Sequence, residues 1–595
     1  MKNNILASIA LFGIYRRKNQ DTYDLVAQYI SAVIAQKEYS EFTASMIQAD
    51  LKEMYMIDIP IGVIKSVCKK RIKGVMINNG SFTCARFPKD EIDQEYNELK
   101  AEYEDLFNPL INYVREATQE YDDQYIKDRF ADYLVEGNTT ETRLNNLFAA
   151  FIASNQESRD IRKKIDLLSS GLISYNGLSY TDTAGNSGAW TDHLTVFLDT
   201  EFLFSCAGYH DDYHQAVFKD LFDLVTEVNN SYRRRTKKED NLIELKYLHD
   251  TREIYLSIFA SAKQLIENKA APDPSKRALT RIVQESPTSS EVELHKAIID
   301  SAVKNTYHIV YDDKDYDHYI TDPRYVVYDQ PTYSSLTKEY NPTGDDATNR
   351  KIDYYSRVFT IINGLRNGKP IHVFEQSRYI FLTGSRIGRG TSMVVQNDNK
   401  TVSFATDIDF LVSRLWFKLN KQLVNGRIPV SLDIVARSQA VLTREVSRKV
   451  REFYEELKKR DLSDLEKQTY YANLKETEQF LEPYNQVSTQ DVLTFIEYTN
   501  FDEIIEAQHA LRRRAAEVDR KDKELTEAKG QLARKDEELA GLRKDIAART
   551  EDHQKEQSEA TAINGRQQRI IKGLALSLAI VCIGTIILIF ILVMK

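Results

Sequence analysis

The sequence is poor in cysteine and has no excess of positive charge, and both features exclude classes of protein. Only four of the 595 residues are cysteine, and Cys68, Cys84 and Cys206, which precede the last apolar stretch, lack the spacing of a metal-ligand pair. An odd and sparse set of cysteines is typical of a reducing compartment. The formal net charge of -9 provides no general attraction to nucleic acid, so such binding requires local basic patches.

Two common signatures of chemistry are missing as well. The ten histidines contain no zinc-binding pair; His210 and His214 come nearest, and because no third ligand is close in sequence we expect both at the surface. The segment Gly384–Gly390, "GSRIGRG", lacks the Gly-Lys-Ser/Thr ending of a P-loop, which argues against nucleotide hydrolysis. Its Arg386 and Arg389 fit either a loop that contacts RNA phosphates or a solvated turn.

The length and composition indicate several globular units. A chain of 595 residues is too long for one core, and 42% hydrophobic with 28% charged residues is typical of globular proteins. We predict a multidomain α/β protein with the following parts: a winged-helix-like domain over 1–89, a helical region over 90–185, an α/β domain over 190–438 with an insertion at 268–349, a helical region over 439–500, a long helix or weak coiled coil over 501–572 and a membrane anchor over 573–594.

The membrane anchor is predicted from one uncharged stretch, Gly573–Met594, which is long enough to cross a bilayer as a helix. Only Lys595 follows it, so the sequence predicts a single-pass, tail-anchored protein. Three basic residues precede the span, namely Arg566, Arg569 and Lys572. This bias predicts that the N-terminal part lies in the cytoplasm.

The first residues allow a second topology. Met1–Tyr15 has a lysine followed by an apolar run and is similar to a signal peptide, but "RRK" follows at once and no convincing cleavage site is present. Ile5, Ile9 and Phe12 lie on one helical face, which favours a docked amphipathic helix.

The segment before Pro88 has a recognisable order of elements. Two predicted helices, "TASMIQADLKEMY" and "IPIGVIKSVCKKRIKG", precede a hairpin, "VMINNGSFTCARF", that turns at Asn79-Gly80. Helix, turn, helix and two-stranded wing resemble a winged-helix domain. Lys69 and Arg71 are then predicted nucleic-acid contacts. The alternative is a winged helix that binds a protein or acts as a spacer.

Acidic residues interrupt an apolar run at "TVFLDTEFLFS". Val196, Phe197 and Leu198 are typical of a parallel-sheet strand buried on both faces, and Asp199 follows where that strand ends. Because ligands bind outside the carboxyl ends of such strands, Asp199 is either a ligand group or the cap of the next helix.

Further acids occupy similar places along the chain. Glu253 lies in the first turn of the helix after the strand candidate "LIELKYL", Asp353 opens "DYYSRVFTIINGLRNG", and Asp407 with Asp409 follows "VSFAT". The other strand candidates are "RYIFLTG" and "RIPVSLDIV". This succession resembles a PIN-like domain, the metal-dependent ribonuclease fold of many bacterial toxins and RNA-processing enzymes, and "FLDTEFLFS" is the closest match.

The resemblance implies a doubly wound α/β fold whose carboxylates hold Mg²⁺ or Mn²⁺, ions that prefer such oxygens. The implied catalytic and metal-binding acids are Asp199, Glu253, Asp353 and Asp407, with Asp409 as a further metal ligand. The acid that the family places after its fourth strand is missing from "IFLTGS", and Asp407 or Asp409 replaces it, unless the site is degenerate. Asp345 and Asp346 are further candidates for the third position.

A heptad pattern follows position 500. The recurring residues are Leu511, Val518, Leu525, Leu532, Leu539 and Ile546. The complementary core positions are polar or small, so the segment predicts either a weak parallel homodimer or a single helical stalk.

Two functions are consistent with these patterns. The first is a membrane-anchored, metal-dependent nuclease that acts on RNA or another single-stranded nucleic acid, as a toxin-like or defence effector. The second is a non-catalytic membrane scaffold or sensor whose degenerate PIN-like domain binds nucleic acid or a regulatory protein partner.

Overall fold

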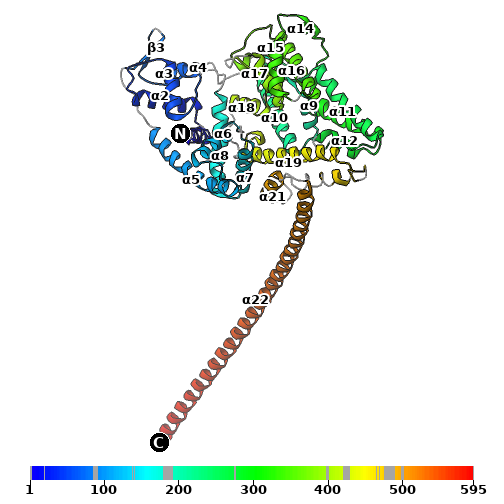
Figure 1. The fold of residues 1–595 in the computed structure, drawn as a ribbon. Helices are drawn as coiled ribbons and strands as arrows, with labels where there is room; N and C mark the ends of the chain where they lie inside the picture. The colour runs from blue at the N-terminus through cyan, green and yellow to red at the C-terminus, as the bar shows by residue number, and fades with distance from the viewer. Residues whose placement is uncertain are drawn as a thin grey trace. The chain divides into compact units, whose positions relative to one another are not determined.

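The computed structural model describes residues 3–593, apart from 19, 79, 85–91, 137–138, 140, 179–191, 274–275, 343, 397–400, 420–428, 464–465, 468, 473, 475–488 and 498–500. The described chain is mostly helical and contains one antiparallel and one parallel sheet (Figure 1). The parallel sheet with its helices confirms the α/β expectation in part, although helices dominate. The chain divides into two compact units, Met1–Ile504 and Ile505–Lys595.

The N-terminal segment combines helices with a small antiparallel sheet. Its elements are α1 (Asn3–Arg17), α2 (Thr22–Gln36), β1 (Glu41–Phe42), α3 (Ala44–Tyr55), α4 (Ile61–Lys70), β2 (Val75–Asn78) and β3 (Ser81–Cys84). The strands are ordered β1-β3-β2. The two predicted helices and the hairpin are present, and Thr43 caps α3 by accepting a hydrogen bond from the Met46 N–H at 3.2 Å. Asn79 of the predicted turn lies outside the described residues.

Helix α1 is a buried core helix, whereas the sequence favoured an amphipathic one. Residues 6–13 are all buried. Close packing against α8 explains this, because a Cβ at Gly13 would lie 2.2 Å from the Leu167 carbonyl oxygen and one at Gly171 would lie 1.9 Å from that of Ile9. Glycine at both positions therefore allows the two helix backbones to approach each other.

The predicted helical region is helical where it is described. It contains α5 (Asp93–Ala117), α6 (Asp123–Glu136), α7 (Thr142–Ser154) and α8 (Arg159–Gly177). The loop that we predicted before β4 falls largely on 179–191, outside the described residues.

The next segment alternates strands and helices. Its elements are β4 (Leu194–Leu198), α9 (Thr200–Ser205), α10 (Asp212–Thr236), β5 (Ile243–Tyr247), α11 (His249–Glu267), α12 (Arg277–Glu285), α13 (Ser289–Ser301), a π-helix (Ala302–Thr306), β6 (Val310–Tyr311), α14 (Asp317–Thr321), α15 (Gln330–Tyr340), α16 (Asp346–Leu365), a 3₁₀ helix (Phe374–Gln376), β7 (Tyr379–Leu382), α17 (Arg386–Gln396), β8 (Ala405–Thr406) and α18 (Ile408–Lys418).

The strands of this segment form one parallel sheet in the order β6-β5-β4-β7-β8. Strand β4 is central, and its Val196 pairs with Leu245 of β5 and Ile380 of β7. From β4 the chain adds β5 and β6 on one side, then returns to add β7 and β8 on the other. Strand β6 lies inside 268–349, so the predicted insertion supplies an edge strand of the sheet.

Strand β4 is buried on both faces, as its apolar run predicted. Val196 and Leu198 belong to the hydrophobic core on one side of the sheet, and Phe197 belongs to the core on the other. This alternation follows from the two-residue period of a strand. Helices cover both faces, which explains why the strand sequence is continuously apolar.

The strand predicted at "RIPVSLDIV" is wrong. Its described part contains a 3₁₀ helix, Val430–Leu432, and the start of α19 (Ile434–Lys459). Asp433 caps α19 by accepting a hydrogen bond from the Val435 N–H at 2.8 Å, and this cap starts a helix where we expected a strand. The predicted boundary between 438 and 439 therefore falls inside α19.

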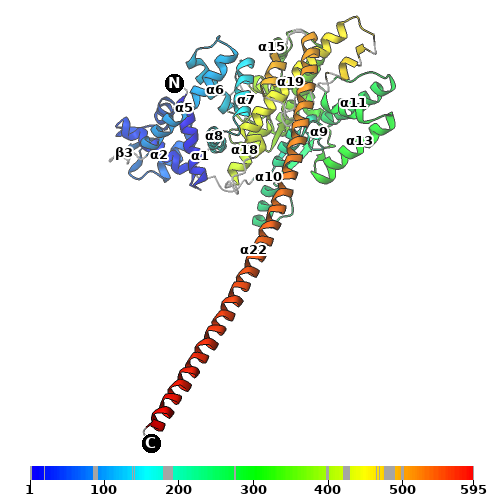
Figure 2. The same cartoon turned by 90° about the horizontal axis from the view of Figure 1, so that it is seen from below.

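The last elements are α21 (Thr489–Glu497) and α22 (Phe501–Val593). Helix α22 is continuous in both views of the chain (Figure 1 and Figure 2). Among the described residues, one helix is long and apolar enough to cross a membrane, and it lies within α22 at Lys523–Ile587. This confirms a candidate membrane-spanning helix by length and composition.

Candidate functional site

Asp199 lies directly after β4 and caps α9. Its Oδ1 atom accepts a hydrogen bond from the Thr200 N–H at 2.7 Å, and its side chain is almost fully buried. Its Oδ2 atom accepts hydrogen bonds from the hydroxyls of Thr383 at 2.7 Å and Tyr355 at 2.9 Å. The Tyr354 hydroxyl donates to Oδ1 at 3.3 Å. Asp199 is therefore both the helix cap and part of a polar cluster, the two alternatives that the sequence left open.

The neighbours of Asp199 come from other elements of the sheet. Thr383 follows β7, while Tyr354 and Tyr355 lie on α16. Burial raises the pKa of the Asp199 carboxyl, although the hydrogen bonds from Thr383 and Thr200 oppose this shift. All of these contacts lie at the carboxyl ends of β4 and β7.

Glu201 is the second acid of this edge, and it was absent from the predicted set. Burial, together with the charge of Asp199, raises the pKa of Glu201 to about 7. Its Oε1 atom accepts a hydrogen bond from the Gly384 N–H, which follows β7. The signal was present in "LDTEFLFS", because Glu201 lies two residues after the acid that we selected.

Asp407 and Asp409 form a second acidic pair at the end of β8. Asp407 caps α18 through the Phe410 N–H at 2.8 Å, and its Oδ2 atom lies 2.8 Å from Nη1 of Arg389. Burial, together with the charge of Asp407, raises the pKa of Asp409 to about 6. The charge of Arg389 opposes the pKa shifts of both Glu201 and Asp409, so this guanidinium lies near both acidic pairs.

We name these five residues the switch-point site: Asp199, Glu201, Arg389, Asp407 and Asp409. In open parallel sheets, ligands bind outside the carboxyl ends of the strands at the point where the strand order reverses. That point lies between β4 and β7 in this sheet. Arg386 and Arg389 also line a cavity of about 580 Å³ together with Asp407, and they lie in helix α17, whereas the sequence analysis expected a loop or turn.

Glu253 and Asp353 are not brought to Asp199. The Glu253 side chain is 59% exposed, with its Oε1 atom 4.0 Å from His249, and Asp353 is exposed and accepts a hydrogen bond from Tyr333. On their helices, Thr251 and Tyr354 take the inward positions, and their hydroxyls lie 3.0 Å apart. Successive residues of an α-helix differ by about 100° in direction, so an error of one or two positions selects a different face.

The predicted metal-binding set is thus only partly assembled. Within the described ranges, no three or more His, Cys, Asp or Glu side chains are grouped so that they would hold a metal ion. Asp345 and Asp346, the further candidates, lie at the start of α16, where Asp345 caps the helix through the Thr348 N–H at 2.8 Å.

Lys69 and Arg71, the predicted nucleic-acid contacts of the N-terminal segment, differ in how they contact other side chains. Lys69 is exposed near the end of α4. The Arg71 guanidinium is 2.7 Å from Asp21, also pairs with Asp24 and stacks over the Tyr23 ring. Its contact with nucleic acid stays a prediction.

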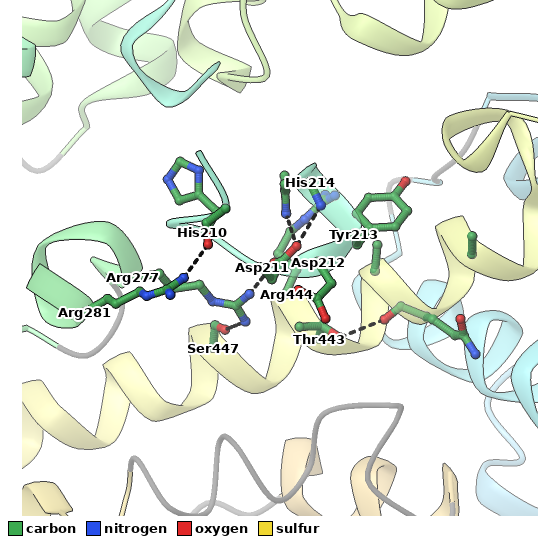
Figure 3. A pocket seen from close by; sticks show the side chains of 14 residues that line it. His210, Asp211, Asp212, Tyr213, His214, Arg277, Arg281, Thr443, Arg444 and Ser447 are labelled. Carbon is green, nitrogen blue, oxygen red and sulfur yellow. Dashed lines mark hydrogen bonds and ion pairs between the residues drawn. The ribbon is translucent and has the colours of Figure 1, made fainter. Parts of the chain in front are cut away.

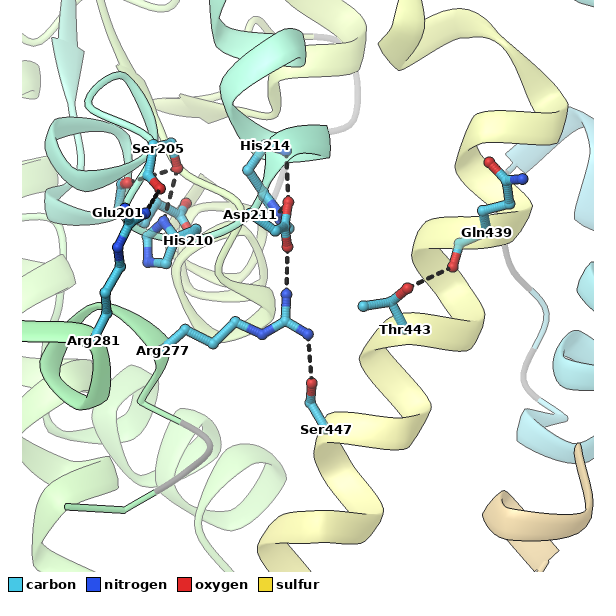
Figure 4. Close-up of polar contacts among 11 residues, drawn as sticks. Glu201, Ser205, His210, Asp211, His214, Arg277, Arg281, Gln439, Thr443 and Ser447 are labelled. Atoms are coloured by element: carbon cyan, nitrogen blue, oxygen red, sulfur yellow. Dashed lines mark hydrogen bonds and ion pairs between the residues drawn. The ribbon is translucent and has the colours of Figure 1, made fainter. Parts of the chain in front are cut away.

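A polar pocket that the sequence analysis missed (Figure 3) lies next to the switch-point site, since the charges of its His214 and Arg444 act on Glu201 and Asp409. Its volume is about 360 Å³, and it is bordered by the start of α10, by α12 and by α19. Ser205 connects it to Glu201, because the Ser205 hydroxyl donates to the Glu201 carbonyl oxygen at 2.8 Å and lies 2.8 Å from Nδ1 of His210 (Figure 4). Burial lowers the pKa of His210 to about 4, so the ring is neutral at pH 7.

Asp211 organises the other side of this pocket. It caps α10 through the His214 N–H at 2.8 Å, contacts Nδ1 of His214 at 2.7 Å and pairs with Arg277 (Figure 4). Burial alone would raise its pKa, but the contacts with His214 and Arg277 outweigh this effect and lower the pKa of Asp211 to about 2. His214 is exposed, as expected, whereas His210 is partly buried. The local signal was the polar run "HDDYH".

No protein-family model, curated protein or solved structure matches this chain.

Proposed function

We propose that the chain is a membrane-anchored ribonuclease that cuts single-stranded RNA at the switch-point site of a PIN-like domain. The observation that carries this proposal is the pair of raised pKa values, of Glu201 and Asp409, at the carboxyl edge of a parallel sheet. The strand order β6-β5-β4-β7-β8 supports the doubly wound PIN-like assignment. The hairpin β2-β3, which follows α3 and α4 and pairs with β1 through β3, supports the winged-helix-like assignment.

Glu201 suits proton transfer during phosphodiester cleavage. Its pKa of about 7 means that both the acid and the carboxylate are populated at neutral pH, which is the condition for efficient general acid-base catalysis. Arg389 pairs with Asp407 at 2.8 Å and its charge also acts on Glu201, and its guanidinium matches the oxygens of a phosphate group. In this proposal Arg389 holds the phosphate, and Glu201 accepts the proton of the attacking oxygen as the new P–O bond forms and the old one breaks. Glu201 then returns that proton to the leaving oxygen.

The PIN-like resemblance also implies Mg²⁺ or Mn²⁺, which would activate water and stabilise negative charge on the phosphate. The carboxylates offer suitable oxygen ligands. However, the oxygens of Asp199 already accept hydrogen bonds, and Asp407 is paired with Arg389. In the described part of the chain, these acids are not grouped so that they would hold a metal ion. We therefore assign no step to the ion, and the experiment compares cleavage with Mn²⁺, with Mg²⁺ and with EDTA.

The test uses the full chain in detergent micelles with end-labelled single-stranded RNA and DNA, in Mn²⁺, Mg²⁺ or EDTA. We expect RNA cleavage by the wild type and a loss of roughly 100-fold or more in Glu201→Gln, since general acid-base catalysis contributes on that scale. Asp409→Asn tests the second pair. Glu253→Gln is the matched control, because this exposed acid lies in the second turn of α11, away from Asp199, and its substitution should leave the rate unchanged.

One observation favours a second function. Asp199 already accepts four hydrogen bonds and Asp407 is paired with Arg389, an arrangement that suits a degenerate site. In this case the domain binds nucleic acid or a regulatory protein partner without cutting. RNA binding by the wild type with no cleavage in any of the metal conditions would establish it and reject the nuclease.

The proposed anchor is the apolar end of α22, with the N-terminal part in the cytoplasm. The candidate span and the basic residues that precede position 573 support this topology. Exposed apolar residues at heptad spacing support a parallel homodimer through α22: Leu525, Leu532, Leu539 and Ile546. The earlier heptad positions, Leu511 and Val518, have side chains outside the described set.

A further inference from the structure

The pocket beside the switch-point site is rich in guanidinium groups. Arg277 and Arg281 reach it from α12, and Arg444 reaches it from α19 on the opposite side (Figure 3). Its volume of about 360 Å³ falls within the range of roughly 300 to 1,000 Å³ that is typical of small-molecule sites.

Two of these arginines are held in place by their own contacts. Arg277 pairs with Asp211 and donates to the Ser447 hydroxyl at 2.7 Å, which links α10, α12 and α19 (Figure 4). Arg281 donates to the Gly208 carbonyl oxygen, and its Nε atom lies 3.0 Å from Glu285. These contacts fix the two α12 side chains at the wall of the pocket.

Arg444 differs from them. It is exposed, and no hydrogen bond or ion pair to it is found within the residues that the structure describes. Arg437, seven residues earlier, lies on nearly the same face of α19, and both guanidinium charges act on Asp409 and Tyr213. Within the described residues, therefore, no acid neutralises the charge of Arg444 by direct contact.

The remaining lining adds hydroxyl groups and rings. Thr443 and Ser447 supply hydroxyls, while His210, Tyr213 and His214 supply aromatic rings. The ring centroids of Tyr213 and His214 lie 5.5 Å apart, and those of His210 and His214 lie 5.9 Å apart. Guanidinium and hydroxyl donors suit a phosphate, and ring faces suit a flat base.

We propose that this pocket binds the phosphate monoester of a nucleotide, with Arg444 contacting the phosphate and the rings of Tyr213 and His214 lying beside the base. The binding requires no cleavage at the switch-point site, so it goes beyond the proposed ribonuclease. The same chemistry is offered by a free mononucleotide and by the terminal phosphate of an RNA strand.

Substitution of Asp212 should change phosphate affinity in the opposite direction to substitution of Arg444. It lines the pocket in the first turn of α10 and is exposed, so its carboxylate repels a bound phosphate. Asp212→Asn should therefore strengthen phosphate binding, whereas Arg444→Ala should weaken it. A purely structural role of the two side chains would not produce opposite changes.

The experiment is isothermal titration calorimetry on the full chain in detergent micelles with EDTA, which prevents metal-dependent cleavage. The probes are adenosine monophosphate, adenosine, inorganic phosphate, and a short RNA with either a 5′-phosphate or a 5′-hydroxyl. We expect binding of the phosphate monoesters, at least about tenfold weaker binding in Arg444→Ala, and a few-fold tighter binding in Asp212→Asn.

The matched control is Arg448→Ala, one turn further along α19, where Arg448 pairs with Glu445 and Glu452 outside the pocket. Mononucleotide binding identifies the free nucleotide as the source, and binding of the phosphorylated RNA alone identifies a strand end. Three results would overturn the proposal: no binding of any phosphate monoester, equal binding of adenosine and its monophosphate, or equal losses in the Arg444 and Arg448 variants.

Discussion

At the scale of single residues, Glu201 links stability to pH. Its pKa rises from 4.5 in the unfolded chain to about 7 in the folded one, so between these values the folded state binds the extra proton. The free energy of unfolding should therefore fall as pH rises through this window. We expect Glu201→Gln to lose this part of the pH dependence and to gain stability relative to the wild type at pH 8.

Thermal unfolding of the full chain at pH 5 and pH 8 measures this effect. The exposed Glu253 supplies the control, and Glu253→Gln should follow the wild type at both pH values. An identical pH dependence in wild type and Glu201→Gln would show that the Glu201 carboxyl titrates normally.

The residue scale also shows how far the sequence predicted the site. Asp199 was predicted because a buried strand ends there, and that signal is local. Glu253 and Asp353 were misplaced because their distance from Asp199 depends on the rotation of α11 and α16, which is set by packing against the sheet. Thr251 and Tyr354 take the inward positions, and no charge pattern in the sequence marks them.

At the scale of elements, the close packing of α1 and α8 makes a definite prediction. A methyl group at position 171 would lie 1.9 Å from the Ile9 carbonyl oxygen, so Gly171→Ala must push the two helices apart. We expect a loss of roughly 1–3 kcal/mol in unfolding free energy, which is typical of overpacking. Lys163→Ala, on the exposed side of α8, should change stability by less than about 0.5 kcal/mol.

Urea denaturation followed by circular dichroism distinguishes the two variants. A midpoint of Gly171→Ala at or above that of the wild type would contradict the packing of α1 on α8. This contact joins residues that are far apart in sequence. The sequence alone does not show why positions 13 and 171 must be glycine, because the reason is the close approach of α1 and α8. By contrast, the strands β4 and β7 were predictable because their apolar runs are contiguous, and β5 because its apolar and charged residues alternate.

At the scale of the whole molecule, the candidate span in α22 makes the proposed membrane anchor testable. An arginine at the centre of a spanning helix costs roughly 2.5–3.5 kcal/mol on insertion, so Ile583→Arg should lower the fraction of the chain that resists alkaline extraction from membranes. Ile546→Arg changes an equally exposed isoleucine in the charged part of the same helix and should leave this fraction unchanged. Full resistance of Ile583→Arg would refute this span, because another part of the chain would then hold it in the membrane, whereas complete extraction of the wild type would show that the chain has no membrane anchor.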